Sequence, residues 1–122
     1  MIKLVYCVRR REDMAPEEFH RYWREEHGPK VKGVKDALRM RRYIQSHSCE
    51  PEMNAALVES RGLAPAYDGI TEVWWDRIED LQEAMASAEG AAAMDLLIED
   101  ESRFIDFKAS RVFMTTEHTV FD

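Results

Sequence analysis

The sequence has few of the residues that mark several protein classes. Only two of its 122 residues are cysteine, Cys7 and Cys49, and they have neither metal-ligand spacing nor a disulfide framework. No apolar run approaches the roughly 20 residues of a membrane span, and the apolar stretch from Met1 to Val8 is too short for a signal peptide. We therefore expect a reduced, cytoplasmic protein with no membrane partner.

Positive charge is also scarce. The chain has 17 Lys and Arg against 24 Asp and Glu, which gives a formal net charge of −7. Phosphate binding needs a basic surface, so we expect no nucleic-acid partner. The basic clusters Arg9-Arg10-Arg11 and Arg39-Met40-Arg41-Arg42 are interpreted as strand ends and salt-bridge partners, with a polyanion site as the alternative.

Signatures of cofactor binding are missing as well. The sequence contains no glycine-rich phosphate loop, no dinucleotide fingerprint, no histidine pair at i, i+4 and no Cys/His cluster. We expect neither a metal nor a cofactor. A haem would need an axial ligand in an apolar pocket, and His27 keeps that alternative open.

What is present is a regular alternation of strand and helix patterns. Alternating apolar and polar residues predict strands at 2–9, 39–48, 70–76 and 109–118. Apolar residues at helical spacing predict a helix at 16–27 that Gly28-Pro29 kinks or restarts, and helical stretches from 78 and from 91 to 104, separated by Gly90. Asp76 is the expected cap of the helix from 78. Residues 49–67 are expected to form a loop with a short helix near 53–58.

This order is β-α-β-β-α-β, the arrangement of a ferredoxin-like α+β fold. We expect one domain over residues 1–122, with a four-stranded antiparallel sheet and helices on one face. The open face would carry Tyr43, Gln45 and Trp74. An exposed sheet face of this size predicts burial by a second copy or around a ligand, so we expect a homodimer.

His27 is the strongest catalytic candidate. Phe19, Trp23 and His27 recur at every fourth position, so on a helix they share one face. An imidazole at the end of this aromatic stripe can exchange a proton with a small organic substrate near neutral pH. The alternative is a histidine that caps a kinked helix through a backbone carbonyl.

A second set of candidates lies on the strand at 39–48. Tyr43, Gln45 and His47 share one face, and they are expected to bind an oxygenated substrate through a hydroxyl, an amide and an imidazole, with His47 as a second catalytic candidate. A shift of one residue in phase would move all three to the helix side or to solvent.

Further candidates come from the other strands. Glu72 and Trp74 share a face and are candidates for substrate binding, with core packing and an arginine partner as the alternative. Tyr6 is a further substrate-binding candidate whose alternation with Ile2 and Leu4 equally favours core packing. His20 is expected at the surface.

Several segments together resemble the EthD family. They follow the family's order over nearly the whole chain: Arg9–Arg11, Phe19–Pro29 with its Tyr-Trp-x-x-x-His-x-Pro element, Arg42–His47, Tyr67–Trp74 and Asp100–Asp106. The resemblance implies a dimeric α+β barrel with a pocket in each subunit. Asp100, Glu101 and Asp106 match the family's acidic element and are interpreted as capping and salt-bridge groups, with metal binding or catalysis as the alternative.

The resemblance leaves two functions open. One is a cofactor-independent enzyme that dehydrates, isomerises or decarboxylates a small catabolite or polyketide, with His27 as general acid or base; a cofactor-free monooxygenase is its close variant. The other is a non-catalytic dimeric ligand-binding or accessory protein that supports an oxidoreductase in ether or xenobiotic degradation.

Overall fold

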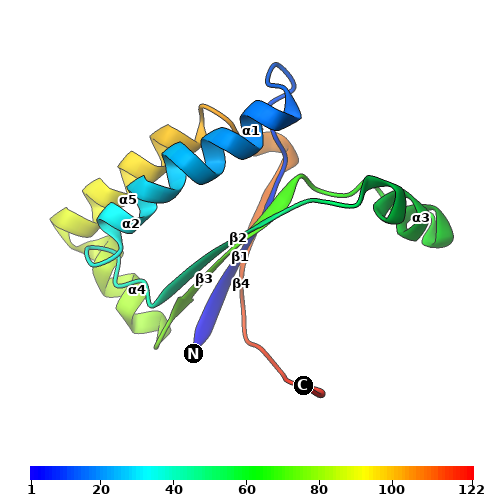
Figure 1. Ribbon diagram of the computed structural model, residues 1–122. Helices are drawn as coiled ribbons and strands as arrows, with labels where there is room; N and C mark the ends of the chain where they lie inside the picture. The colour runs from blue at the N-terminus through cyan, green and yellow to red at the C-terminus, as the bar shows by residue number, and fades with distance from the viewer.

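The computed structural model describes residues 1–122 as a four-stranded antiparallel sheet with helices on one face (Figure 1). The strands are β1 (Ile2–Val8), β2 (Arg42–His47), β3 (Gly69–Trp75) and β4 (Arg111–Thr115). They lie in the order β2-β3-β1-β4, which confirms the predicted ferredoxin-like α+β fold. The strands β2 and β4 are shorter than predicted. Arg39, at φ 57°, turns the chain just before β2.

Helical segments connect the strands. They are α1 (Pro16–Tyr22), the π-helix η1 (Trp23–His27), α2 (Gly28–Val34), α3 (Pro51–Arg61), α4 (Ile78–Ala86), α5 (Ala88–Glu101) and the 3-10 helix η2 (Phe107–Ala109). None of these helices has the length and apolar character needed to cross a bilayer.

The kink expected at Gly28-Pro29 is a turn of π-helix placed just before the proline. In a regular α-helix the ring of Pro29 would clash with the carbonyl of Glu25, and its nitrogen has no hydrogen to donate. Widening the turn at Trp23–His27 accommodates the proline, and the backbone N–H of Gly28 donates to the carbonyl of Trp23. The three segments α1, η1 and α2 therefore run on as one helix, and His27 lies in its widened turn.

The second helical region breaks earlier than predicted. The break lies at Ser87, whose hydroxyl accepts the backbone N–H of Gly90 at 3.0 Å and so caps α5. Gly90 therefore lies inside α5 and does not interrupt it. Its backbone packs on the end of α4, and only glycine fits there because a Cβ would come within 1.9 Å of the Ala84 carbonyl oxygen. The predicted cap by Asp76 is wrong, since Arg77 occupies the N-cap position of α4 without a side-chain bond.

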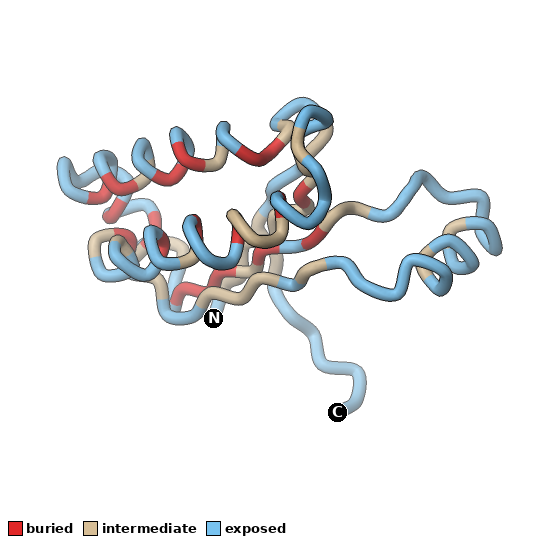
Figure 2. Tube along the Cα trace, turned by 45° about the horizontal axis from the view of Figure 1, so that its top comes forward, coloured by how far each residue is buried: buried red, intermediate tan, exposed pale blue.

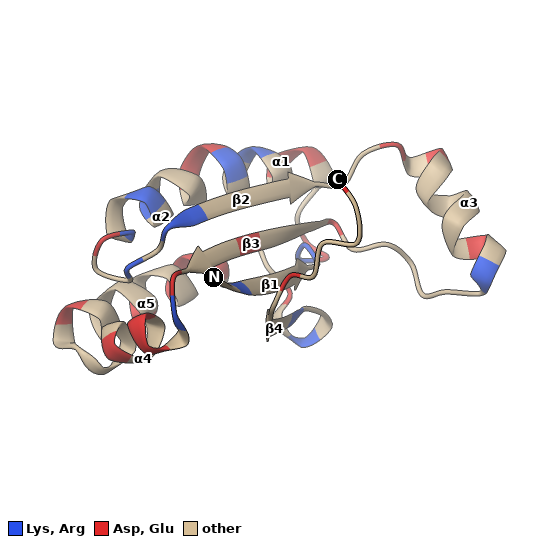
Figure 3. Ribbon diagram, turned by 90° about the horizontal axis from the view of Figure 1, so that it is seen from below, with Lys and Arg blue, Asp and Glu red and all other residues tan.

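The sheet register assigns side chains to its two faces. Tyr43 pairs with Val73, and Arg42 pairs with Trp74. Directly paired residues point to the same side, so Tyr43 faces the helices and Trp74 faces away from them. The expectation that Tyr43, Gln45 and Trp74 share the open face is therefore wrong. Figure 3 shows this face of the sheet with no helix across it.

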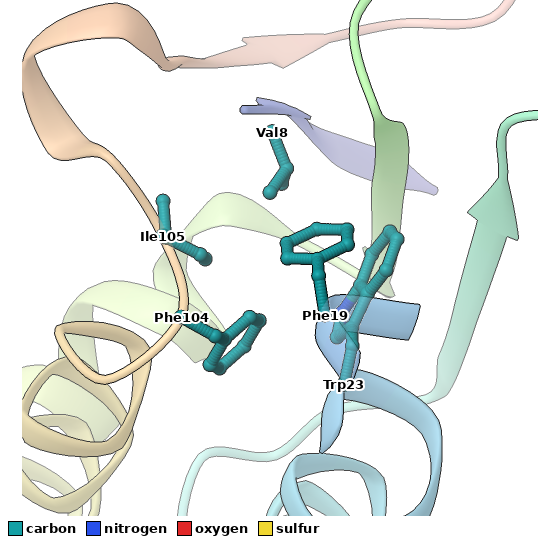
Figure 4. Packing of buried hydrophobic residues seen from close by; sticks show 5 residues of the cluster. All are labelled: Val8, Phe19, Trp23, Phe104 and Ile105. Atoms are coloured by element: carbon teal, nitrogen blue, oxygen red, sulfur yellow. The ribbon is translucent and has the colours of Figure 1, made fainter. Parts of the chain in front are cut away.

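The core lies between the helices and the sheet. Its largest cluster brings α1 and η1 together with β1 and the residues that follow α5. It consists of Val8, Phe19, Trp23, Phe104 and Ile105 (Figure 4). A second cluster packs α2 against α5 and consists of Val31, Leu38, Ala93 and Leu97. Phe19, Trp23 and His27 are all buried, which confirms the predicted stripe.

The segment between β2 and β3 contains the predicted helix near 53–58, but this helix is longer than predicted. It is the 11-residue helix α3, which projects away from the sheet as an arm (Figures 1 and 2). No residue of α3 is buried, and its side chains Met53 and Leu57 are exposed.

Candidate active site

A cavity of about 380 Å³ lies between the helix-facing side of the sheet and the helices. Fourteen of its 17 lining residues are hydrophobic, and the other three are His27, Thr71 and Glu101. Tyr6 and Tyr43 add phenol groups to the same wall. A largely apolar cavity with a few converging polar groups is typical of a small-molecule site.

The imidazole of His27 is held by a buried carboxylate. Its Nδ1 lies 2.7 Å from Oδ2 of Asp100, and the side chains of both residues are almost fully buried. An ionised carboxylate only accepts hydrogen bonds, so Nδ1 carries the hydrogen and donates it. The other ring nitrogen, Nε2, has no hydrogen-bond partner in the protein, and the ring lines the cavity.

Asp100 accepts from three donors. Besides His27, the Tyr22 hydroxyl and the Lys30 ammonium each lie 2.6 Å from its Oδ1. Burial works to raise the pKa of Asp100, but these hydrogen bonds, led by that from Lys30, outweigh it and leave the pKa below its usual value. The carboxylate therefore stays charged and fixes the orientation of the His27 ring.

The pKa of His27 is lowered from its usual value. Burial of the ring is the main cause, and it outweighs the hydrogen bond that Nδ1 donates to Asp100, which favours the charged form. The ring is therefore neutral near pH 7, with an available lone pair on Nε2. This is the state that a general base requires.

Glu101 is a second ionisable group of the cavity. Burial raises the pKa of its carboxyl to about 7, and the neighbouring charge of Asp100 adds to this effect. The phenol of Tyr6 lies beside it and works in the opposite direction. At neutral pH a substantial fraction of Glu101 is protonated, so it can donate a proton where His27 can accept one.

A chain of polar side chains leads from the surface to Tyr43. The Gln45 amide nitrogen donates to the Trp23 carbonyl at 2.9 Å and to the Tyr43 hydroxyl at 3.0 Å. The Gln45 oxygen then accepts from Nε2 of His47 at 2.8 Å. Nδ1 of neutral His47 is thereby left as an acceptor for Nδ1 of His20, 2.8 Å away. This chain orients the Tyr43 hydroxyl in the cavity wall.

The structure places three of the predicted site residues in the cavity wall and the others outside the cavity. His27, Tyr6 and Tyr43 line the cavity. His47 and Gln45 face the helices but lie outside the cavity, where they support Tyr43. His20 is half-buried against His47, so the surface position expected for it is wrong.

Glu72 and Trp74 lie on the opposite face of the sheet. Glu72 accepts from the Lys3 ammonium at 2.7 Å, and the indole N–H of Trp74 donates to Glu117 at 2.8 Å. Their neighbours are charged side chains at the open face, and the sheet separates them from His27.

Asp100 forms a salt bridge with Lys30, as predicted, but its contact with His27 and the place of Glu101 in the cavity were not predicted. The signal lay in spacing: Ala93, Leu97, Asp100 and Phe104 follow one another at intervals of three and four residues, so an acidic residue occupies the apolar stripe of α5. An acid on a buried stripe indicates a buried partner. No group of three or more His, Cys, Asp or Glu side chains is arranged to hold a metal ion.

Comparison with known proteins agrees with this architecture. The structure resembles an EthD family protein from Bacillus halodurans, with a TM-score of 0.63 and 22% sequence identity over 97% of this chain and 99% of that one. An EthD-like protein from Ralstonia eutropha gives a TM-score of 0.56 and 17% identity over 93% and 88% of the two chains. A dimeric protein of ferredoxin-like fold from Bacteroides fragilis gives 0.58 and 10% over 93% of each.

Sequence comparison supplies the family. No curated protein matches the chain. The EthD domain matches residues 11–108, a range that includes the π-turn, the edge strand β2 and the acidic pair on α5. The chain therefore belongs to the EthD domain family.

Proposed function

We propose that this protein is a cofactor-independent acid–base enzyme that acts on a small organic molecule bound in the cavity. The observation that carries the proposal is the orientation of His27, whose Nδ1 is fixed on Asp100 while Nε2 has no partner and the ring lines an apolar cavity. The reaction class is a proton transfer on carbon or oxygen, as in dehydration, isomerisation or decarboxylation.

Each step has a residue suited to it. In a dehydration, Nε2 of His27 takes the proton from carbon, and the resulting imidazolium is stabilised by the Asp100 carboxylate 2.7 Å away. The protonated carboxyl of Glu101 gives its proton to the leaving hydroxyl, which departs as water as the double bond forms. Proton exchange with solvent then restores both residues.

The pH dependence expected from this pair is bell-shaped. Activity falls at acidic pH as His27 becomes protonated, and it falls again above about pH 7 as Glu101 loses its proton. The apolar walls exclude water and strengthen the charge interactions on which both transfers depend.

The proposal includes a homodimer. The open face of the sheet carries apolar side chains that nothing covers within the chain, among them Ile70 and Phe113, and the arm α3 exposes Met53 and Leu57. A patch of this kind on a small domain is typical of a protein–protein interface. A second copy would bury the same face of both subunits around a two-fold axis.

Base catalysis can be tested before a natural substrate is known. A panel of small aromatic ketones, β-hydroxy ketones and lactones is incubated with the protein in D2O, and deuterium uptake and water loss are followed by NMR. We expect turnover of at least one compound by the wild type and a drop of about 100-fold or more in His27→Ala. The control is Glu18→Gln on α1, which removes an exposed charge far from the cavity.

A second function, ligand binding without catalysis, is favoured by the apolar character of the cavity, in which 14 of 17 lining residues are hydrophobic. The same panel separates the two functions. Compounds that bind without exchange or product in the wild type contradict the enzyme proposal and support a carrier or accessory protein. Equal turnover by wild type and His27→Ala contradicts the assignment of His27.

A further inference from the structure

A basic groove lies between α2 and the edge strand β2, with a volume of about 420 Å³. Five of its ten lining residues are cationic, and none is acidic: Arg24, Lys32, Lys35, Arg41 and Arg42. The chain as a whole carries a net charge of −7. Figure 3 shows Lys and Arg at α2 and at the start of β2, while α4 carries acidic residues.

The charges of this groove are poorly neutralised by the protein. Lys32, Lys35 and Arg42 form no ion pair, and Arg42 lies over the Trp74 ring at 4.7 Å instead. Arg41 reaches Asp76 only at 3.7 Å. Many other cations of the chain are closely paired, including Lys3, Arg11, Arg21, Lys30 and Arg39, each within 2.8 Å of a carboxylate.

The groove and the cavity share a wall. Val31, Met40 and Tyr43 line both of them. A ligand that extends past these three side chains would therefore have its apolar body in the cavity and its charged end beside Lys32 and Lys35. Gathered cations without carboxylates raise the local concentration of anions and accelerate their association.

From this juxtaposition we propose that the groove is an anion-binding site and that the ligand is an amphipathic organic anion, with an apolar, ring-sized body and a carboxylate, sulfonate or phosphate group. The inference rests on the proposed function only in that both place a ligand in the cavity. It adds the charge of the substrate and its orientation, with the anionic end toward α2 and the reacting end toward His27.

Two fluorescent probes of the same skeleton test the inference. One is 1-anilinonaphthalene-8-sulfonate, which carries an anionic group, and the other is neutral N-phenyl-1-naphthylamine. Dissociation constants of both are measured by fluorescence titration at low and high NaCl. The variants are Lys32→Gln/Lys35→Gln in the groove and, as a control, Lys108→Gln, which removes a solvent-exposed lysine outside the groove.

We expect the double variant to weaken binding of the sulfonate about three- to tenfold and to leave the neutral probe unchanged, as two exposed charge contacts would give. High salt should reproduce the effect in the wild type. Met94→Trp, which fills the cavity, should weaken both probes. An unchanged sulfonate affinity in the double variant, or an equal loss of both probes, overturns the anion site.

The outcome is independent of catalysis. His27 does not line the groove, so His27→Ala should preserve the ratio of the two affinities. A charge-selective ratio without any turnover would leave the anion site intact and refute the enzyme proposal. Turnover that depends on His27, with no charge selectivity, would support the enzyme proposal and refute the anion site.

Discussion

Nδ1 of His27 lies 2.7 Å from Oδ2 of Asp100, although 73 residues separate them in the sequence. The contact joins the π-turn that precedes Pro29 to the last turn of α5. It fixes both the direction of the imidazole and the nitrogen that carries its hydrogen, and so determines that Nε2 is the nitrogen left for chemistry in the cavity.

Replacement of Asp100 by Asn should change the tautomer of His27. An amide N–H facing Nδ1 can only donate, so the ring hydrogen would move to Nε2 and the lone pair would be lost from the cavity. We also expect a loss of about 1–3 kcal/mol in the free energy of unfolding, because buried donors lose their charged acceptor. Long-range 15N–1H NMR reports the tautomer, and urea unfolding reports the stability.

Asp95→Asn is the matched control, because Asp95 is an exposed acid on the same helix. It should leave the His27 spectrum and the unfolding curve unchanged. Persistence of the Nδ1–H tautomer in Asp100→Asn would contradict the role given to Asp100.

Glu101 should make the protein less stable as the pH rises toward neutrality. Its pKa is about 7 in the folded protein against 4.5 ordinarily, so the folded state holds a proton that the unfolded state has lost. The contribution of this bound proton to the free energy of unfolding is complete below pH 4.5 and disappears as the pH passes 7. The free energy of unfolding of Glu101→Gln should therefore rise relative to that of the wild type by about 2–3 kcal/mol as the pH goes from 4.5 to 8. Urea unfolding at each pH measures this difference.

Glu99→Gln, which alters an exposed neighbour on α5, provides the comparison. Its stability difference from the wild type should not grow with pH in the way predicted for Glu101→Gln. Parallel curves for Glu101→Gln and the wild type would mean that Glu101 titrates normally.

Local patterns were sufficient to predict the order of strands and helices and the buried stripe of Phe19, Trp23 and His27. These features depend on spacing along one segment. The partner of His27 could not be predicted in the same way, since it depends on how α5 packs against η1. The face of Tyr43 depends on strand register, where a shift of one residue reverses the assignment. The helix α3 was predicted only as a short helix near 53–58, because it has no buried face and hence no apolar stripe that would mark its full length.

The histidine pair should titrate at unusually low pH. Burial of His47, together with the nearby His20 and Arg24, lowers its pKa to about 4. The folded state therefore resists protonation, so the stability that this group contributes is present above its ordinary pKa of about 6.5 and is lost as the pH falls toward 4. NMR titration should give a midpoint well below 6 for the His47 ring.

His20→Gln removes one cause of that low value, so the midpoint of His47 should rise in this variant. The distant change Arg77→Gln should leave it unaltered. A midpoint of His47 that does not respond to His20→Gln would show that the two rings do not interact in solution.

Two glycines should respond in opposite directions to the same substitution. A Cβ on Gly69 would come within 2.6 Å of both the Trp23 indole and the Ser46 carbonyl oxygen. Gly69→Ala should therefore cost about 1–3 kcal/mol through overpacking. Gly33, in α2, has open space around it. Gly33→Ala should stabilise the protein by about 0.5–1 kcal/mol, since alanine favours the helix. Thermal unfolding compares the two variants, and a neutral Gly69→Ala would mean that the Trp23 ring can shift.

The proposed dimer predicts that a charge on the open sheet face separates the subunits. Phe113 is 52% exposed and pairs with Val5 on β1, so it projects from this face. Phe113→Glu would place a carboxylate in a buried, apolar interface, where an unpaired charge is strongly unfavourable. Sedimentation equilibrium should report a dimer for the wild type and a monomer for the variant. The control Leu96→Glu adds the same charge at an exposed apolar site on α5, on the helical side of the molecule, and should remain dimeric. If both variants sediment like the wild type, the subunits must associate through another surface, and the exposed face needs a different partner.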